Sequence, residues 1–348
     1  MNGPMLRVLV VEDSPLARLL LRDMLDAAHG FEIAGEAADG AAAVELAARL
    51  KPDVVLMDLH LPKKNGLEAT TEIMQQAPVP ILIFTATGVD PEGKLPFAVL
   101  AAGAVDLFPK PRLERQDNFA AIADKLRARL RLVSTVRAIR RFPARAALAP
   151  GVARPQRLPR VLAIGASTGG PAAVIEALKD LPPSMPAAVL LVQHMFQEFM
   201  PGLVSWLAGN IRLPVKMAAH GDALRPGVVL VAPGNRHMLL GPDGRVALED
   251  TAPVHSCRPS ADLLFNSVAA QAGSSAIGVL LTGMGDDGAE GLLRLRRAGA
   301  VTAAQDEASC AVYGMPRAAA ELGAAEHILP PAEIGRLVAR CLALEASQ

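Results

Sequence analysis

One serine in this sequence stands where a nucleophile is expected. Ser167 directly follows the apolar run Leu162–Ala166 and precedes Thr-Gly-Gly, after which Pro171 opens a predicted helix. The glycines permit a tight turn from a strand into a helix, and proline suits a first helical position. Such a turn leaves the serine hydroxyl exposed beside backbone N–H groups that can hold a developing oxyanion. The Gly-x-Ser-x-Gly pattern therefore predicts acyl chemistry at Ser167, with a structural or phosphate-binding glycine loop as the alternative.

A serine nucleophile needs a base, and an acid that orients the base. His194 follows the apolar run Ala187–Gln193, so it is expected at the same edge of a sheet as Ser167. Asp286 and Asp287 follow a third apolar run, inside a glycine-rich segment. The chain order Ser…His…Asp differs from the Ser…Asp…His order of ordinary α/β-hydrolases and disfavours that fold. Asp287 has a plainer alternative role, because it could cap the helix predicted to follow it.

A second group of polar residues follows predicted strands in the first part of the chain. Glu12 and Asp13 follow the first strand, Asp58 the third, Thr85 the fourth and Lys110 the fifth. The carboxyl ends of parallel strands meet at one edge of a sheet, where clustered carboxylates repel one another. A hard divalent cation such as Mg²⁺ relieves that repulsion. We therefore predict a phosphoryl-accepting site, with Asp58 as the nucleophile, Lys110 as ion-pair partner of the phosphate and Thr85 as a hydroxyl that binds it. A helix-capping or loop aspartate is the alternative for Asp58.

Both sites require sheets that bring strand ends together. In the first part the predicted strands are Leu6–Val11, Glu32–Glu36, Val54–Met57, Ile81–Phe84 and Ala104–Phe108, with helical segments such as Pro15–Ala27 and Gly40–Arg49 between them. In the second part they are Arg160–Ala166, Ala187–Gln193, Val228–Ala232, Ala276–Thr282, Ala300–Ala304 and Glu326–Leu329. Strands separated by helices of this length indicate an α/β fold with parallel, doubly wound sheets covered on both faces. The segment 237–248 differs, because Asp243-Gly244 at its centre predicts a hairpin.

Length and composition narrow the class of protein. A chain of 348 residues is expected to form two domains, each large enough for its own core. Lys+Arg and Asp+Glu both number 35, so no overall field favours nucleic acid or a membrane. Cys257, Cys310 and Cys341 lack metal-ligand spacing and form no disulfide framework, which fits a reducing cytoplasm; the first two are interpreted as packing residues. The sequence has no signal-peptide layout and no apolar run of membrane-spanning length, so a cytoplasmic protein without membrane insertion is expected.

A basic segment separates the two parts. Residues 125–160 contain eleven Lys or Arg residues and no Asp or Glu. Residues 142–159 are rich in Ala, Pro and Arg without periodicity, which is typical of an interdomain linker; an anchor for an acidic partner is the alternative. Phe142 is the single aromatic residue of this segment, so there is no pattern of interleaved aromatic residues; there is also no recognisable DNA-binding motif, which argues against nucleic acid as a partner. We predict domains at residues 1–125 and 158–348, joined by a linker at residues 126–157.

The first part resembles a response-regulator receiver domain. The resemblance spans roughly residues 5–125 and rests on Val-Val-Glu12-Asp13-Ser, Leu-Met-Asp58-Leu-His60-Leu-Pro, Phe-Thr85-Ala and Pro-Lys110-Pro, in the expected order. It implies a flavodoxin-like fold, with Mg²⁺ held by Glu12, Asp13, Asp58 and the backbone carbonyl of His60. Glu12 departs from the commoner Asp and lengthens one ligand arm. Leu107 occupies a position where an aromatic side chain often swings on activation, and the adjacent Phe108 is expected to point to the other face.

The whole chain resembles the chemotaxis protein-glutamate methylesterases and glutamine deamidases, the CheB family. In the second part the resemblance rests on Ile-Gly-Ala-Ser167-Thr-Gly-Gly-Pro, Val-Gln-His194-Met, Ala-Pro-Gly-Asn-Arg-His-Met, Arg258-Pro-Ser-Ala-Asp, Leu-Thr-Gly-Met284-Gly-Asp-Asp287-Gly and Glu-Ala-Ser-Cys310-Ala-Val-Tyr-Gly-Met-Pro. It implies a Rossmann-like methylesterase domain with a catalytic triad of Ser167, His194 and Asp287. Thr168 and Met284 are candidates for support of the base and for the oxyanion site.

This resemblance also implies a function in sensory adaptation. The implied substrate is a glutamate γ-methyl ester on the cytoplasmic domain of a methyl-accepting chemoreceptor, and deamidation of a glutamine would pass through the same acyl intermediate. A histidine kinase is the implied phosphodonor, with Mg²⁺ for receiver phosphorylation and no cofactor for ester hydrolysis. The receiver is expected to cover the Ser167 edge until Asp58 is phosphorylated. The alternatives are a non-catalytic binding module that keeps this fold, and a receiver-regulated nucleic-acid binder that uses the basic segment.

Overall fold

The chain forms two compact units, Met1–Pro143 and Ala144–Gln348, which are described in turn. The computed structural model describes residues 5–86, 95–111, 119–136 and 160–343. Helix α5 (Phe119–Ser134) continues past the predicted end of the first domain, so the boundary expected between residues 125 and 126 falls inside this helix. Most of the predicted linker, residues 137–157, lies outside the described residues. No helix in the described ranges is long and apolar enough to cross a membrane.

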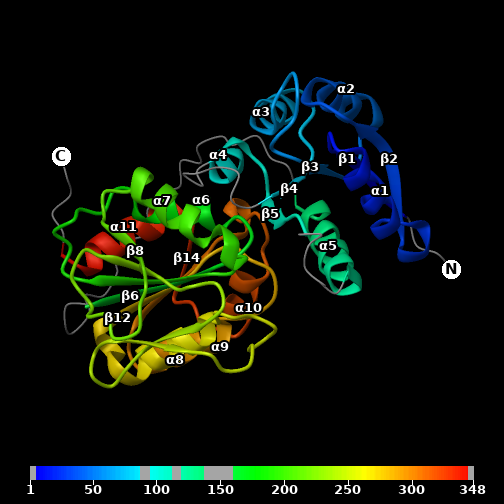
Figure 1. The fold of residues 1–348 in the computed structure, drawn as a ribbon. Coiled ribbons are helices and arrows are strands. Elements are labelled where there is room, and N and C mark those ends of the chain that lie inside the picture. Colours follow the sequence, from blue (N-terminus) through cyan, green and yellow to red (C-terminus); the bar gives the residue numbers. More distant parts are fainter. Residues whose placement is uncertain (1–4, 87–94, 112–118, 137–159, 344–348) are drawn as a thin grey trace. The chain divides into compact units, whose positions relative to one another are not determined.

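The first unit is a five-stranded parallel sheet with the strand order β2-β1-β3-β4-β5. Its strands are β1 (Leu6–Val11), β2 (Phe31–Ala37), β3 (Val54–Met57), β4 (Ile81–Thr85) and β5 (Asp106–Pro109). The helices besides α5 are α1 (Pro15–Met24), α2 (Gly40–Leu50), α3 (Gly66–Gln76) and α4 (Leu95–Ala102). Helices α1 and α5 lie on one face of the sheet, and α2, α3 and α4 lie on the other (Figure 1). This order is that of the flavodoxin-like fold, so the predicted fold class is confirmed for this unit.

Local sequence explains where these helices begin. Ser14 and Asp39 accept the backbone N–H groups of Ala17 and Ala42, as N-cap residues do. Asn65 caps α3 through a reciprocal capping box with Glu68. Ser14 and Asp39 closely follow the ends of β1 and β2, so the loop that carries Glu12 and Asp13 is short, whereas Asn65 follows a longer loop that carries Asp58 and His60.

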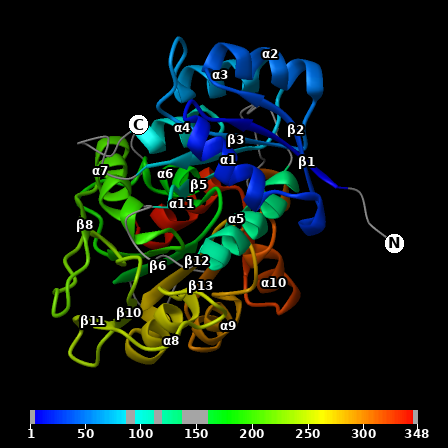
Figure 2. The same ribbon diagram turned by 45° about the vertical axis from the view of Figure 1, so that its right-hand side comes forward.

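The second unit is a seven-stranded parallel sheet with the order β14-β13-β12-β6-β7-β9-β8. Its strands are β6 (Val161–Ala166), β7 (Ala188–Gln193), β8 (Val215–Met217), β9 (Val229–Val231), β12 (Ala276–Leu280), β13 (Val301–Gln305) and β14 (His327–Leu329). Helices α8 (Ala261–Gln271), α9 (Ala289–Arg297) and α10 (Met315–Glu321) cover one face, and α6 (Gly170–Leu178), α7 (Met200–Asn210) and α11 (Pro331–Cys341) cover the other (Figures 1 and 2). The predicted doubly wound sheet is confirmed here as well. A core that includes Leu264, Phe265, Leu280 and Leu292 fills the space under α8 and α9.

Two smaller elements complete this unit. The predicted hairpin is present as β10 (His237–Leu240) and β11 (Val246–Glu249), with Gly244 at φ 73° in the connecting turn. Strand β8 was not predicted, because three residues with no fully buried side chain leave no readable alternation.

The order in which the strands are added to the sheet reverses direction at β6. Strand β6, the first of the unit, has β7 on one side and β12 on the other. In open α/β sheets the carboxyl ends of the strands at such a switch point form the usual crevice for ligands. Ser167, His194 and the segment Thr282–Gly288 all follow these three strands.

Candidate functional site

Ser167 and His194 follow residues that are paired in the sheet. Ala166 of β6 is in register with Gln193 of β7, and the N–H of His194 donates to the carbonyl of Ala166 at 2.9 Å. The N–H of Ser167 donates to the carbonyl of Thr282 at 3.0 Å, which ties the serine to the end of β12. The sheet therefore brings the predicted nucleophile, the predicted base and the loop of the predicted acid to one edge.

The turn after Ser167 depends on two glycines. Gly169 has φ +78°, and a Cβ there would lie 2.5 Å from Cβ of Ala311. A Cβ on Gly170 would lie 2.2 Å from Oε1 of Gln193. Both positions exclude a side chain, so the strand can bend directly into α6.

Ser167 is less accessible than the sequence suggested. The turn was expected to leave its hydroxyl exposed, yet the residue is only 6% exposed. The loop after β12 covers it: a Cβ on Gly283 would lie 2.6 Å from Cβ of Ser167. The serine is thus enclosed by an element that comes from more than 100 residues along the chain.

Asp287 holds the imidazole of His194. Its Oδ2 lies 2.8 Å from Nε2 of His194 and also accepts the N–H of Ala261 at 2.7 Å. Its Oδ1 accepts the hydroxyl of Ser260 at 2.6 Å and the N–H of Asp262 at 3.3 Å. The backbone donors are the first N–H groups of α8, where a carboxylate is stabilised by the helix dipole. Asp287 therefore accepts hydrogen bonds from the first turn of α8. The alternative, that it caps α9, does not hold, because the N-cap of α9 is Gly288.

The neighbouring acid has a different environment. The side chain of Asp286 is 65% exposed and lies 3.3 Å from Nδ1 of His255, whereas that of Asp287 is 2% exposed. Only Asp287 is placed against His194.

Burial and hydrogen bonding set the protonation of this pair. Burial acts to lower the pKa of His194, but the hydrogen bonds with Asp287 and Cys257 outweigh it and raise the pKa to about 9. Burial acts to raise the pKa of Asp287, but the bonds from His194, Ser260 and Ala261 hold it below its usual value. The ionised carboxylate of Asp287 keeps a proton on Nε2 of His194. Nδ1 is therefore the ring nitrogen that can accept a proton from a nucleophile.

Nδ1 of His194 faces a cysteine. The Sγ atom of Cys257 lies 3.8 Å from Nδ1, and among the described residues Ser167 Oγ has no hydrogen-bond partner. The interpretation of Cys257 as a packing residue missed this contact, because the two residues are 63 positions apart. One ligand atom from each of His194, Cys257 and Asp287 lies within 4.8 Å of the others, but both oxygens of Asp287 already accept protein donors. We therefore assign no metal to this cluster.

Two further polar residues brace the site. Nε2 of Gln193 donates to the carbonyls of Ser167 at 2.7 Å and of His194 at 3.2 Å, so it links the two strand ends. The hydroxyl of Thr282 donates to the carbonyl of Thr168 at 3.0 Å and accepts the N–H of Val312 at 3.0 Å. Sequence reasoning overlooked both braces. The signal was a polar residue directly at, or just beyond, the end of a fully buried strand.

The predicted oxyanion residues differ in accessibility. Thr168 is 2% exposed, whereas Met284, which belongs to the loop that covers Ser167, is 57% exposed. In the part of the chain that the structure describes, the N–H of Met284 donates no hydrogen bond. That group is free to receive a developing negative charge; the roles of Met284 and Thr168 stay predictions.

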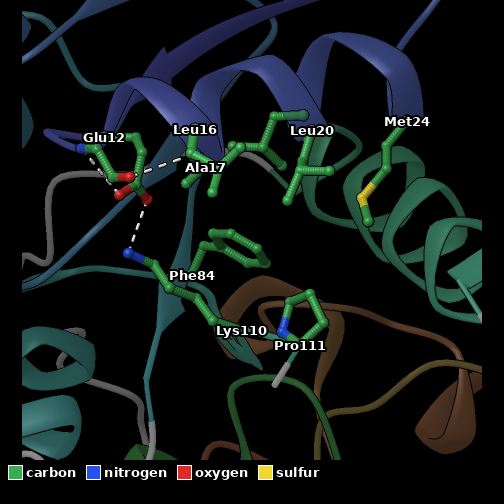
Figure 3. A pocket seen from close by; sticks show the side chains of 10 residues that line it. Glu12, Leu16, Ala17, Leu20, Met24, Phe84, Lys110 and Pro111 are labelled. Atoms are coloured by element: carbon green, nitrogen blue, oxygen red, sulfur yellow. Dashed lines mark hydrogen bonds and ion pairs between the residues drawn. The ribbon is translucent and has the colours of Figure 1, made fainter. Parts of the chain in front are cut away.

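The second predicted cluster lies at the carboxyl edge of the first unit. Nζ of Lys110 lies 2.7 Å from Oδ2 of Asp58 and 2.7 Å from Oε2 of Glu12 (the Glu12 pair is drawn in Figure 3). Burial acts to raise the pKa of Glu12 and prevails over the opposing effect of Lys110. Burial acts to lower the pKa of Lys110, but Asp58 and Glu12 together raise it. The lysine therefore stays charged beside two buried carboxylates.

The donor set fits a magnesium ion and a phosphoryl group. One carboxylate oxygen from each of Glu12, Asp13 and Asp58 lies within 4.8 Å of the others, a hard set of the kind that Mg²⁺ prefers. His60 follows Asp58 by two residues, and its side chain is exposed. The hydroxyl of Thr85 is buried without a hydrogen-bond partner in the described structure, so it can bind an added polar group such as a phosphoryl oxygen.

Apolar groups border this acidic cluster. A cavity of about 230 Å³ lies beside Glu12 and Lys110, lined by Leu16, Leu20 and Met24 of α1 with Phe84 and Pro111 (Figure 3). The rings of Phe84 and Phe108 are 6.2 Å apart, whereas Leu107 is buried in register with Ile83. Phe108 thus occupies the face opposite to Leu107, as expected from strand alternation.

Fold and sites together define a class of protein: an α/β unit in which a serine and a histidine–aspartate pair follow neighbouring strands, preceded by a unit of the receiver type. The family model described as CheB methylesterase matches residues 162–338, and that described as response regulator receiver domain matches residues 8–122. The chain belongs to the CheB methylesterase family and carries a response regulator receiver domain.

Named relatives and a solved structure agree with this assignment. Protein-glutamate methylesterase/protein-glutamine glutaminase 2 of Anaeromyxobacter dehalogenans is 47% identical over 333 residues, which is 95% of each chain. Protein-glutamate methylesterase/protein-glutamine glutaminase 4 of Geobacter metallireducens is 44% identical over 95% of this chain and 97% of its own. The crystal structure of the Thermotoga maritima CheB methylesterase catalytic domain is 34% identical and has a TM-score of 0.51, covering 52% of this chain and 98% of that domain.

Proposed function

We propose that this protein hydrolyses glutamate γ-methyl esters on the cytoplasmic domain of a chemoreceptor. The observation that carries the proposal is the imidazole of His194, held by a buried carboxylate at the end of the strand next to Ser167. The names of the relatives support the ester and the glutamine side chain as substrates. The family makes a non-catalytic module or a nucleic-acid binder the weaker alternative.

The reaction uses the three residues in sequence. Oγ of Ser167 attacks the ester carbonyl while Nδ1 of His194 accepts its proton, and Asp287 stabilises the imidazolium that forms. N–H groups near Ser167, with Met284 and Thr168 as the candidates, stabilise the oxyanion. The imidazolium then protonates the departing methoxide, and methanol leaves. Water, deprotonated by His194, releases the glutamate; with a glutamine substrate the first leaving group is ammonia, so deamidation uses the same acyl intermediate.

The receiver supplies the control by phosphorylation. Asp58 accepts a phosphoryl group from a histidine kinase, Lys110 neutralises its charge and the unpaired hydroxyl of Thr85 binds one of its oxygens. Glu12, Asp13, Asp58 and the carbonyl of His60 would hold Mg²⁺, which would neutralise charge during the transfer. No cofactor is needed for ester hydrolysis. With this substrate and phosphodonor, the protein acts in the cytoplasm and serves sensory adaptation.

Inhibition by the receiver is the form of control that we propose. The unphosphorylated receiver covers the Ser167 edge, and phosphorylation weakens that docked state by about 1–3 kcal/mol, the usual scale of such coupling. Leu107 in place of an aromatic side chain is expected to make the gain on phosphorylation smaller. A chain of residues 158–348 should therefore hydrolyse receptor methyl esters faster than the unphosphorylated full chain. Equal rates for the short chain and for the full chain with and without phosphate would contradict this control.

One substitution tests the proposed reaction. Ser167→Ala removes a single oxygen and should abolish methanol release from a methylated chemoreceptor, with little change in unfolding. Ser184→Ala, at an exposed serine in the turn before β7, is the matched control and should keep full activity. Near-normal methanol release by Ser167→Ala would reject the serine mechanism.

A further inference from the structure

The one ring nitrogen that can serve as the base is already in contact with a thiol. Because Nε2 of His194 donates to Asp287, only Nδ1 can take the proton of Ser167. Sγ of Cys257 lies 3.8 Å from that nitrogen. Cysteine sulfur is a weak hydrogen-bond acceptor, so it stabilises the protonated form of Nδ1, and Cys257 and Ser167 compete for the same nitrogen.

A constrained turn fixes the position of this thiol. Val254 and Cys257 form an antiparallel bridge, with N–H···O distances of 3.0 and 2.7 Å. The two residues between them, His255 and Ser256, have φ values of 48° and 62°. Left-handed backbone at non-glycine residues costs conformational energy and persists only where the surrounding structure imposes it. The placement of Cys257 is therefore specified by its surroundings.

The segment on both sides of Cys257 is anchored to the active site. The ring of His255 lies 3.5 Å from Asp262 and 3.3 Å from Asp286. On the other side, the hydroxyl of Ser260 donates to Asp287, the same carboxylate that holds His194. The thiol and the acid thus reach opposite nitrogens of one imidazole, and Ser260 links the segment that carries the thiol to the acid.

The other two cysteines have a different chemistry. Burial raises the pKa of Cys310 to about 12 and also raises the pKa of Cys341. Of the three cysteines, Cys257 is the one whose sulfur contacts an imidazole. A soft electrophile is therefore expected to react slowly with Cys310 and Cys341, because the thiolate is the reactive form and burial disfavours it.

We propose that Cys257 is a positioning residue of the esterase site, whose thiol holds Nδ1 of His194 while Ser167 is not engaged and thereby restrains the base. The inference rests on the proposed function, since it assumes that His194 activates Ser167. Turnover then requires this contact to be released, and a covalent adduct on the sulfur blocks the base.

The charges around His194 make a substitution at Cys257 informative. Asp287 and Cys257 face the ring directly, and Asp262, Asp286 and His255 lie behind them. Replacing Cys257 leaves all of these charged groups in place. Any change in the titration of the base therefore comes from loss of the thiol.

The first test compares two variants of the full chain. Cys257→Ala removes the sulfur, and Cys257→Val replaces it with a somewhat larger apolar side chain that leaves no cavity. Loss of the contact lowers the pKa of His194, so the acidic limb of the kcat/KM profile should move to lower pH in both variants. Each pH unit of that shift raises the fraction of free base at neutral pH by up to about tenfold. Cys341→Ala, far from the imidazole in α11, should leave the profile unchanged. An unchanged acidic limb in Cys257→Ala would overturn the inference, as would a shift in Ala but none in Val, which would indicate packing alone.

The second test labels the thiol. Iodoacetamide forms an S–C bond with loss of iodide and the thiol proton, and peptide mapping identifies the labelled cysteine. Labelling at Cys257 should stop methanol release in the wild type, whereas Cys257→Ala treated in the same way should keep its rate. Full activity of a protein labelled at Cys257 would overturn the inference. Ser167→Ala is assayed beside them: if it hydrolyses the ester, the proposed function fails, whereas an inactive Ser167→Ala with unaltered Cys257 variants rejects only the role of the thiol.

Discussion

Replacing Asp287 by asparagine removes the charge of the acid that we propose orients His194 and keeps its shape. Four donors converge on the two carboxylate oxygens, namely Nε2 of His194, the hydroxyl of Ser260 and the N–H groups of Ala261 and Asp262. Asparagine offers one acceptor oxygen, so its NH₂ group must face two of these donors. The change therefore perturbs both the ionisation of His194 and the entrance of α8.

The size of the effect follows from His194. Its pKa is raised from 6.5 to about 9, and a shift of that size corresponds to about 3 kcal/mol of stabilisation of the imidazolium. The shift is the net of a decrease from burial and increases from Asp287 and Cys257, so this figure gives the scale of the contribution of Asp287. A loss of about 3 kcal/mol of transition-state stabilisation would lower kcat by about 10²-fold. If NH₂ faces the ring, the proton moves to Nδ1, and a wrong tautomer costs about 10⁴-fold in a Ser-His-Asp site. Unpaired buried donors should also lower stability by about 1–3 kcal/mol.

Methanol release measures the rate, and urea unfolding confirms that each variant is folded under the assay conditions. Asp286→Asn is the matched control, because it makes the same change one residue away on an exposed side chain. We expect Asp287→Asn to lose between about 10² and 10⁴ in kcat and Asp286→Asn to stay close to the wild type. A folded Asp287→Asn variant with nearly full activity, or equal losses in both variants, would refute the assignment of the acid.

Two further predictions concern protonation and phosphorylation. The raised pKa of His194 stabilises the folded state fully below its ordinary value of 6.5, and that contribution is lost as the pH rises through about 9. The free energy of unfolding should thus fall over this interval by up to about 3 kcal/mol in the wild type and change less in His194→Gln; equal slopes would contradict the assignment. At the receiver, Asp58 should take up a phosphoryl group only with Mg²⁺ present, and Asp58→Asn should take up none. Mass-spectrometric mapping of the phosphate to another residue would reject Asp58 as the acceptor.

Much of the fold could be predicted because most strands are recognisable in the sequence as apolar runs. Strands β1 and β3 begin and end at the predicted residues, and β6 and β7 differ by one residue at their starts. Each run is fully or largely buried in a parallel sheet, so hydrophobicity alone reports it. Strand β8 was not predicted because it is a short strand at the edge of the sheet.

Only the site residues that directly follow a strand could be predicted from the sequence. Ser167 and His194 follow paired residues, so their proximity was readable from sequence. The distinction between Asp286 and Asp287 depends on which carboxylate turns towards α8, and adjacent residues give no signal for that. The contact of Cys257 depends on a turn with two left-handed residues, His255 and Ser256, neither of which is glycine. A sequence pattern does not encode such tertiary constraints.

The central claim is that Ser167 forms the acyl intermediate, and direct detection of that adduct tests it. The full chain is mixed with a methylated chemoreceptor cytoplasmic domain, quenched within one turnover, digested and mapped by mass spectrometry. We expect a transient ester between the receptor glutamate and the peptide that contains Ser167, absent in Ser167→Ala. Methanol release without an adduct, or an adduct on Cys257 as a thioester, would contradict the account.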